Sequence, residues 1–186
     1  MPILAKEPDI YPHELLEADT ECPDGQKWFV IHTLSRREKE LMRRLRTFKI
    51  AHYSPLAESR KRSPAGRIRT SYLPLFPGYV FIRANEDDRY RTVATGCVSN
   101  CLEVVDADEL IDDLRRIQLL NQAGADIRPE PTPLVGRKAM VITGPMTGVE
   151  GTITQQHSQH RLTVVVTFMQ QGASVTIDEA DVNLLD

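Results

Sequence analysis

The amino-acid sequence predicts an α+β protein built from an N-terminal α/β sandwich and a small C-terminal β-barrel. Up to residue 122, strand-like and helix-like segments alternate in the order β-α-β-β-β-α-β-α, which is typical of helices covering one face of a largely antiparallel sheet. A stretch containing Pro129, Pro131 and Pro133 follows. Beyond it come five short strand-like segments with no helical segment between them, which is the pattern of a small barrel.

The predicted sandwich begins with a strand and a basic helix. Residues 28–32 are apolar and rich in strand-forming side chains. Ser35 and Glu38 have the spacing of a capping box, and leucines repeat at helical spacing behind them, so we expect a helix over residues 36–48. The other predicted elements are strands over residues 51–57, 67–73, 78–83 and 101–105 and helices over residues 87–94 and 107–121.

These patterns divide the chain into four parts. Residues 1–27 carry scattered prolines and acids without lasting periodicity, so we expect a flexible extension. Residues 28–122 form the predicted sandwich, residues 123–133 a proline-rich linker, and residues 134–186 the predicted barrel. The expected barrel strands cover residues 138–143, 151–156, 162–168, 174–177 and 182–185.

Composition argues against several classes of protein. No run of the 186 residues is long and apolar enough to cross a membrane, and the N-terminus lacks the pattern of a signal peptide, so we expect a cytoplasmic protein. Cys22, Cys97 and Cys101 form no CxxC pair, which indicates neither a disulfide framework nor a zinc site. We find no nucleophile–base spacing and no phosphate-binding glycine loop. The sequence therefore predicts a binding protein without metal or cofactor, and not an enzyme.

Charge is strongly segregated along the chain. The formal net charge is -3, yet residues 28–70 carry twelve basic and three acidic side chains, a local charge of +9. So dense a group of like charges attracts polyanions even within an acidic protein. A solvated helix face and an exposed loop are the alternative explanation.

An aromatic strand follows a Pro-Gly corner. Tyr79 and Phe81 alternate with apolar residues, so they share one face of the predicted strand, and Phe76 can join them from the other side of the corner. If the alternate residues pack under the helices, the aromatic side chains lie on an open face, and such a patch usually marks a binding site. Two partners fit it, namely a hydrophobic helix of another protein and stacked RNA bases. Burial of the rings under another part of the chain is the alternative.

A second motif is a glycine-rich turn between two predicted barrel strands. Gly144, Gly148 and Gly151 are expected to supply the positive φ angles with which closely spaced strands reverse.

Together these motifs resemble the NusG family of transcription elongation factors, from Trp28 to Leu185. Residues 28–33 open the resemblance, residues 76–80 (Phe-Pro-Gly-Tyr-Val) are its strongest signature, and the glycine-rich turn is similar to the family's KOW motif. The positions similar to that motif are Gly144, Pro145, Met146, Gly148 and Gly151. The resemblance implies a ferredoxin-like N-terminal domain and an SH3-like KOW barrel.

The resemblance also implies a function. A member of this family docks on the clamp helices of the RNA polymerase β′ subunit, and the matching positions here are His32, Phe76, Tyr79 and Phe81. The face expected near the non-template DNA strand of the transcription bubble carries Arg36, Arg37, Lys39, Arg43 and Arg44. The barrel is expected to recruit a further partner, with Rho and a small-subunit ribosomal protein as candidates, and the factor itself is expected to be a monomer. An RNA-binding or ribosome-associated module is the alternative function.

Departures from the family pattern indicate a specialised member, similar to RfaH-type antiterminators. Tyr90 stands where the family usually has tryptophan, and Met146 and Met169 stand where it has phenylalanine. Some such paralogues hold the C-terminal domain as a helical hairpin. Residues 162–167 are rich in β-branched side chains, which resist helix formation, so we expect a permanent barrel here.

Overall fold

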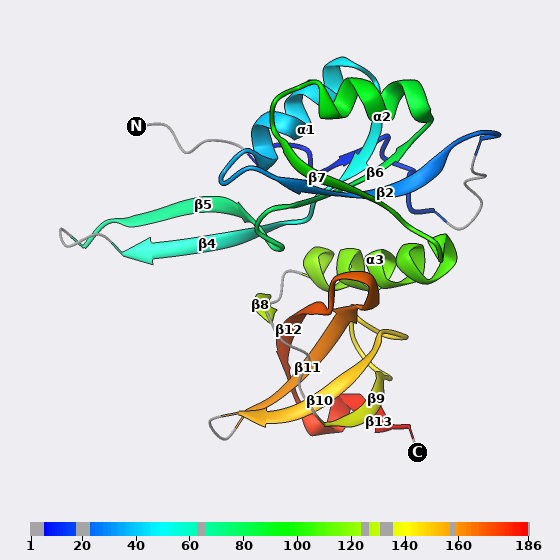
Figure 1. Cartoon of the computed structure of the whole chain (residues 1–186). Coiled ribbons are helices and arrows are strands. Elements are labelled where there is room, and N and C mark those ends of the chain that lie inside the picture. The colour runs from blue at the N-terminus through cyan, green and yellow to red at the C-terminus, as the bar shows by residue number, and fades with distance from the viewer. Residues whose placement is uncertain are drawn as a thin grey trace. The chain divides into compact units, whose positions relative to one another are not determined.

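The computed structural model describes residues 6–17, 23–62, 66–123, 127–130, 136–156 and 159–185 (Figure 1). The chain divides into two compact units, residues 1–105 and 106–186. Helix α3 (Ala107–Gln122) therefore groups with the C-terminal strands. The boundary predicted after residue 122 stays a prediction. No helix among the described residues is long and apolar enough to cross a membrane.

The first unit is an antiparallel sheet carrying helices, as predicted. The strands pair in the order β1-β3-β6-β2-β7. Leu41 and Leu45 of helix α1 pack against Phe29 and Ile82 of the sheet in one buried cluster, which explains the helical spacing of the leucines. The elements of this sheet are β1 (Ile10–Tyr11), β2 (Lys27–Thr33), α1 (Glu38–Thr47), β3 (Ala51–Tyr53), β6 (Tyr79–Ala84), α2 (Glu86–Val93) and β7 (Val98–Glu103).

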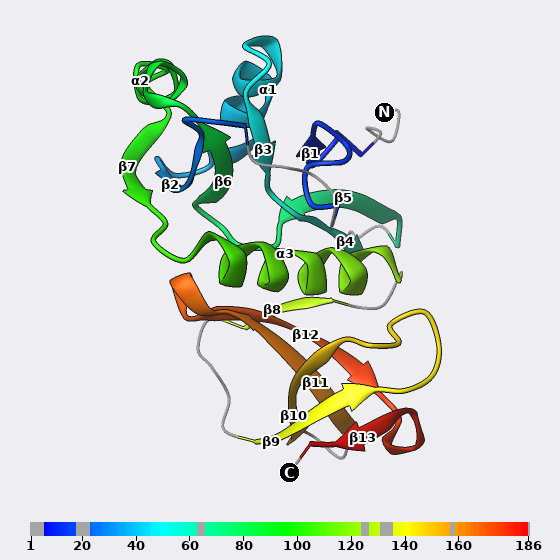
Figure 2. The same ribbon diagram turned by 90° about the vertical axis from the view of Figure 1, so that its right-hand side faces the viewer.

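The predicted strand over residues 51–57 is divided in two. Ser54 and Pro55 separate β3 from β4 (Leu56–Arg62), because proline cannot donate to a sheet ladder. Among the described residues, strand β4 pairs only with β5 (Ile68–Pro74), and the two form a separate two-stranded sheet. Figures 1 and 2 show this hairpin reaching away from the five-stranded sheet. The sequence predicts no strand over residues 58–66, but strand β4 continues to Arg62.

The N-terminal extension is ordered over residues 6–17, where the sequence predicts flexibility. Ile10 and Tyr11 pair with Tyr53 and His52, which adds strand β1 to the sheet edge. Leu15 and Leu16 are each only 3% exposed. Their burial offsets the conformational entropy that an acidic, proline-rich segment loses on ordering.

The second unit is a six-stranded antiparallel sheet with helix α3. The strands pair in the order β13-β9-β10-β11-β12-β8. Within the described residues the two edge strands do not pair with each other, so the sheet is not a closed barrel. Both edges are three-residue strands, and the predicted linker contributes one of them. The strands are β8 (Arg128–Glu130), β9 (Arg137–Val141), β10 (Glu150–Gln156), β11 (Gln159–Val166), β12 (Gln171–Ile177) and β13 (Val182–Leu184), with 3-10 turns η1 (Thr167–Met169) and η2 (Glu179–Asp181).

Two polar contacts hold this unit together. The carboxylate of Asp113, which is 3% exposed on helix α3, accepts a hydrogen bond from the backbone N–H of Thr167 at 2.8 Å. The buried guanidinium of Arg161 donates to the hydroxyl and carbonyl oxygens of Ser174. Because residues 159–166 form strand β11, the structure has the strand that the β-branched residues predict.

A buried histidine links strand β3 to the extension and provides a test of this fold. His52 is fully buried, its Nδ1 lies 2.8 Å from the carbonyl oxygen of Ile50, and its ring stacks on Tyr11 at 5.9 Å between centroids. Burial lowers the pKa of His52 from 6.5 to about 4. Between these two pH values the unfolded chain binds the proton and the folded chain does not, so acid favours unfolding.

We therefore predict that the free energy of unfolding falls as the pH drops from about 6.5 to about 4, by up to roughly 3 kcal/mol from this residue. His52→Gln should reduce the slope of stability against pH in that window, measured by chemical denaturation at several pH values. Exposed His13, replaced in the same way, is the control for loss of a histidine. Equal slopes for wild type and His52→Gln would contradict the assignment.

Candidate functional site

The Pro77-Gly78 corner is held by a carboxylate from helix α1. Gly78 has φ of +85°, which favours glycine, and a Cβ there would lie 3.3 Å from Nε2 of His32. Glu38 Oε1 accepts a hydrogen bond from the N–H of Gly78 at 2.7 Å, and the N–H of Thr33 donates to the Gly78 carbonyl at 2.8 Å. Glu38 is only 7% exposed. The corner is thus fixed to both α1 and β2.

This contact corrects the expected capping box. The backbone of Arg37 occupies the N-cap position, and its side chain makes no capping hydrogen bond with the described residues. Glu38 points instead to the corner, which is distant in sequence, so spacing alone could not reveal its partner. Arg36, predicted as the first helical residue, has φ of +59° and precedes the helix.

The four predicted polymerase contacts come together around the corner, but they differ in exposure. His32 is exposed and Tyr79 is half-buried, with 5.1 Å between their ring centroids. Phe76 and Phe81 are buried, at 2% and 0% exposure, and meet edge to face at 6.5 Å. The expectation of an open patch is wrong for these two rings. The accessible part of the predicted contact is His32 together with the uncovered part of Tyr79.

The sheet face of Phe81 also contains unsatisfied polar atoms. Val80 and Ile82 pack in the helix-side cluster, so Phe81 and Arg83 lie on the opposite face. Tyr53 is directly opposite Phe81 in the register. Among the described residues, the hydroxyl of Tyr53 and Nε of Arg83 are buried without a hydrogen-bond partner. Such atoms destabilise the folded chain until something pairs with them.

Most of the predicted DNA-facing arginines, which lie on helix α1 or just before it, already have partners. Arg37 and Arg44 both bind the carboxylate of Glu40, and Arg44 also donates to the carbonyl of Thr95 at 2.8 Å. Arg43 donates two hydrogen bonds to Glu7, at 2.8 and 2.7 Å. Arg36 is exposed and Lys39 is half-buried, and neither makes an ion pair with the described residues. The charge of this helix is therefore largely balanced within the molecule.

Glu7 comes from the extension and was not predicted as part of the site. Its hydrogen bond to Arg43, with help from the charges of Lys39 and Arg46, lowers the pKa of the Glu7 carboxyl. The carbonyl of Pro8 accepts a bond from Arg46 at 2.7 Å, and Asp9 accepts one from the N–H of Ser54 at 2.8 Å. The sequence does show an acidic extension before a basic helix, but composition does not reveal which carboxylate binds which arginine.

The predicted KOW residues lie in the turn between β9 and β10, except Gly151, which lies in strand β10. Gly144 and Gly148 have positive φ, +81° and +87°, as expected. The expectation is wrong for Gly151, where the reason for glycine is space, because a Cβ would lie 2.6 Å from the carbonyl oxygen of Thr163. The N–H of Gly148 bonds to the Val141 carbonyl, closing the turn at 2.8 Å. Pro145 and Met146 lie within it, exposed and half-buried respectively.

One known family model matches most of the first unit and the start of helix α3. Residues 26–113 match the family model NusG, described as transcription termination factor nusG. The match contains strand β2, helix α1, the β4–β5 hairpin and the Pro77-Gly78 corner. No curated protein shows a significant match to the chain. Residues 26–113 are thus similar to a NusG-family domain, and the matched part stops within helix α3.

The role of Glu38 leads to a prediction about the corner. Glu38→Ala leaves the N–H of Gly78 without its partly buried acceptor, so the free energy of unfolding should fall by about 1–3 kcal/mol. Glu38→Gln retains an amide oxygen that can accept the hydrogen bond, so it should lower the free energy of unfolding clearly less than Glu38→Ala does. Chemical denaturation of both variants checks this prediction. Equal losses in the two variants would show that the hydrogen bond does not hold the corner.

Proposed function

We propose that this chain is a non-enzymatic transcription elongation and antitermination factor that binds the clamp helices of the RNA polymerase β′ subunit. The NusG-family match over residues 26–113 carries the proposal. This match supports a general role in transcription elongation or termination, with RNA polymerase as the main partner. Clamp-helix binding and antitermination are the finer steps that we add.

The Pro77-Gly78 corner has the properties that such a contact requires. His32 and Tyr79 form an accessible ring pair whose backbone is fixed by Glu38 and Thr33. A rigid aromatic pair loses little conformational entropy when it binds, so it makes an effective anchor for an apolar helix. Phe76 and Phe81 can add contact area only after whatever covers them moves. Binding would then also bring hydrogen-bond partners to the Tyr53 hydroxyl and to Nε of Arg83.

We propose nucleic-acid contact for fewer residues around helix α1 than the sequence predicts. Arg36 and Lys39 are the members of the predicted set that make no ion pair with described residues, so they are the best placed to attract phosphate. For Arg37, Arg43 and Arg44 to contact the non-template strand, phosphate must replace Glu40 or Glu7.

We propose that the second unit acts as a KOW domain and recruits another component. The β9–β10 turn has the predicted positive φ angles at Gly144 and Gly148, which supports this proposal. Rho and a small-subunit ribosomal protein are the candidate partners. Met146 and Met169, which replace phenylalanines of the family pattern, favour a specialised RfaH-type factor, which we propose to be cytoplasmic and monomeric.

The alternative of RNA binding by base stacking is less well supported. Stacking several bases requires exposed rings on adjacent positions of a sheet. Tyr79 is half-buried and Phe81 is fully buried, so one ring at most is available on strand β6.

The polymerase contact can be tested at its accessible positions, His32 and Tyr79. Phe76→Ala would leave a cavity costing roughly 3–5 kcal/mol of stability, so it cannot distinguish binding from folding. We predict that His32→Ala together with Tyr79→Ala weakens binding of the full chain to purified RNA polymerase about tenfold or more, because the anchoring rings are lost. Surface-based binding measurements and read-through of a terminator in transcription assays check this.

Tyr90→Ala is the matched control, because Tyr90 is a tyrosine of the same domain that is 75% exposed on helix α2. It should leave polymerase affinity unchanged. If the His32/Tyr79 variant binds as tightly as wild type while remaining folded, the proposed contact is wrong.

A further inference from the structure

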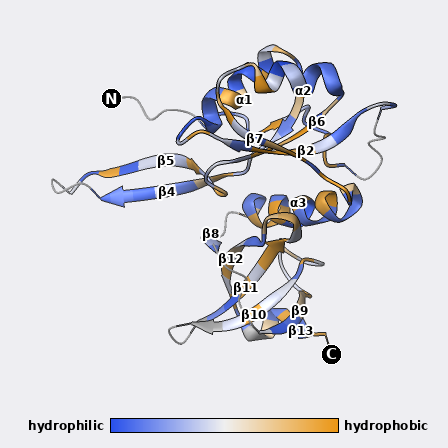
Figure 3. Cartoon of the chain, in the orientation of Figure 1, coloured by the Kyte–Doolittle hydropathy of each residue, from blue (hydrophilic) through white to orange (hydrophobic). Residues whose placement is uncertain are grey.

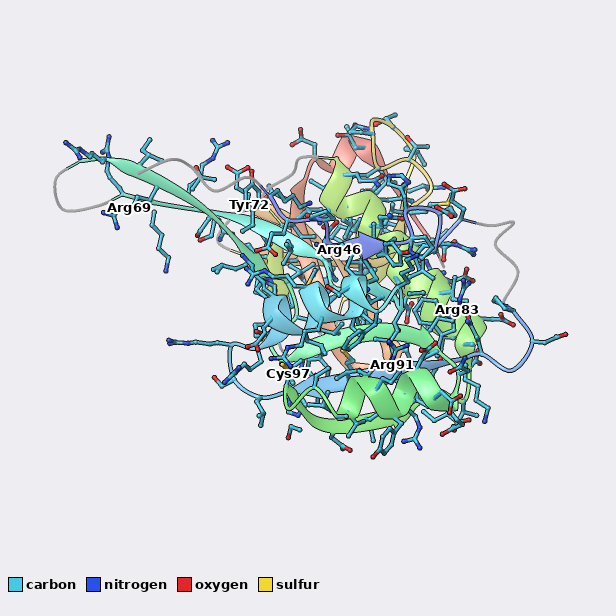
Figure 4. The ribbon with its side chains drawn as sticks, turned by 90° about the horizontal axis from the view of Figure 1, so that it is seen from above. Arg46, Arg69, Tyr72, Arg83, Arg91 and Cys97 are labelled. Atoms are coloured by element: carbon cyan, nitrogen blue, oxygen red, sulfur yellow. The ribbon has the colours of Figure 1, made fainter. Side chains whose placement is uncertain are left out.

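The β4–β5 hairpin is an isolated basic arm. Its base is anchored where Leu56 is buried and where the N–H of Leu75 donates to the Pro55 carbonyl at 2.8 Å. Neither strand pairs with the five-stranded sheet. Figure 4 shows labelled Arg69 far out on the arm, and Tyr72 closer to the body of the domain. Figure 3 shows strand β4 mostly in hydrophilic colours.

Like charges face each other across this arm. Lys61 is directly opposite Arg69, so both side chains lie on one face of the ribbon. Directly opposed like charges destabilise a strand pair. Lys61, Arg62 and Arg69 are exposed and make no hydrogen bond or ion pair through their side chains with described residues. The acidic residue of the two strands, Glu58, is already bound by Arg60.

Helix α1 provides the contrast. Its arginines are bound by Glu7, by Glu40 and by the carbonyl of Pro8. Most basic side chains of the helix therefore have partners within the molecule, whereas Lys61, Arg62 and Arg69 of the arm make no ion pair with described residues. A polyanion gains more from the arm, because it need not displace an internal carboxylate there.

We propose that the β4–β5 hairpin is a nucleic-acid-binding arm that contacts the backbone of a double helix. A two-stranded ribbon fits the major groove of B-DNA, which is about 12 Å wide. Lysine and arginine side chains along the ribbon suit phosphate contacts, which position a protein without reading sequence. This site is distinct from the helix α1 residues and from the polymerase contact at His32 and Tyr79, and it does not depend on either.

The test measures binding of the full chain to a fluorescent DNA duplex of about 20 base pairs by anisotropy, over a series of salt concentrations. Lys61→Gln with Arg69→Gln should weaken binding about tenfold at low salt and reduce the salt slope by up to about 2, since each lost phosphate contact contributes about 0.9. The matched control is Arg137→Gln with Lys138→Gln, an exposed arginine–lysine pair on strand β9 of the other unit. The control should bind as wild type does.

Several results would overturn the proposal. These are absence of duplex binding by the wild type, unchanged binding by the arm variant, equal losses in both double variants, and tighter binding to the single strand than to the duplex. Removal of opposed charges should not unfold the arm, and circular dichroism checks this. Polymerase binding without DNA separates the two proposals, because the arm variant should retain it whereas the His32/Tyr79 variant should lose it.

Discussion

The hydrogen bond from the Gly78 N–H to the Glu38 carboxylate is the contact on which the proposed interface depends. It joins the first residue of helix α1 to a corner forty residues later and places Tyr79 beside His32. Because the carboxylate is mostly buried, removing it leaves an unsatisfied donor and not merely a weaker contact. Only glycine fits position 78 without strain, because the residue there has a positive φ and lies close to the His32 ring. Helix, corner and ring pair thus form one unit.

A second constraint is the distribution of internal carboxylates. Glu7 and Glu40 bind the arginines of helix α1, and the extension that carries Glu7 is itself fixed by strand β1 and by buried Leu15 and Leu16. The hairpin has no comparable set of acids. A basic stretch that is continuous in sequence therefore becomes a balanced helix and an unbalanced arm in the structure.

The sequence predicts the features that depend on local pattern. The strand at residues 28–32, the leucine stripe of helix α1 and the helix expected over residues 107–121 all match the structure. Asp106 caps that helix by accepting a hydrogen bond from the Glu109 N–H at 2.9 Å. The predicted strand over residues 51–57 is divided at Pro55, because proline cannot donate a backbone hydrogen bond within a sheet. This local rule was available from the sequence.

The features that the sequence does not predict depend on distant contacts. The direction of the Glu38 side chain, the pairing of Glu7 with Arg43 and the burial of Phe76 and Phe81 all require knowledge of the tertiary structure. Alternation correctly separates the face of Phe81 from that of Ile82, but it cannot show whether that face is covered. Gly151 illustrates the same limit, because its close neighbour is the Thr163 carbonyl of another strand.

Site-specific photocrosslinking tests the central claim most directly. A photoreactive phenylalanine analogue at position 79 of the full chain should crosslink to the clamp helices of the RNA polymerase β′ subunit, and the same analogue at exposed position 90 should not. Crosslinks from position 79 to another polymerase region, or equal crosslinking from both positions, would contradict the proposed interface.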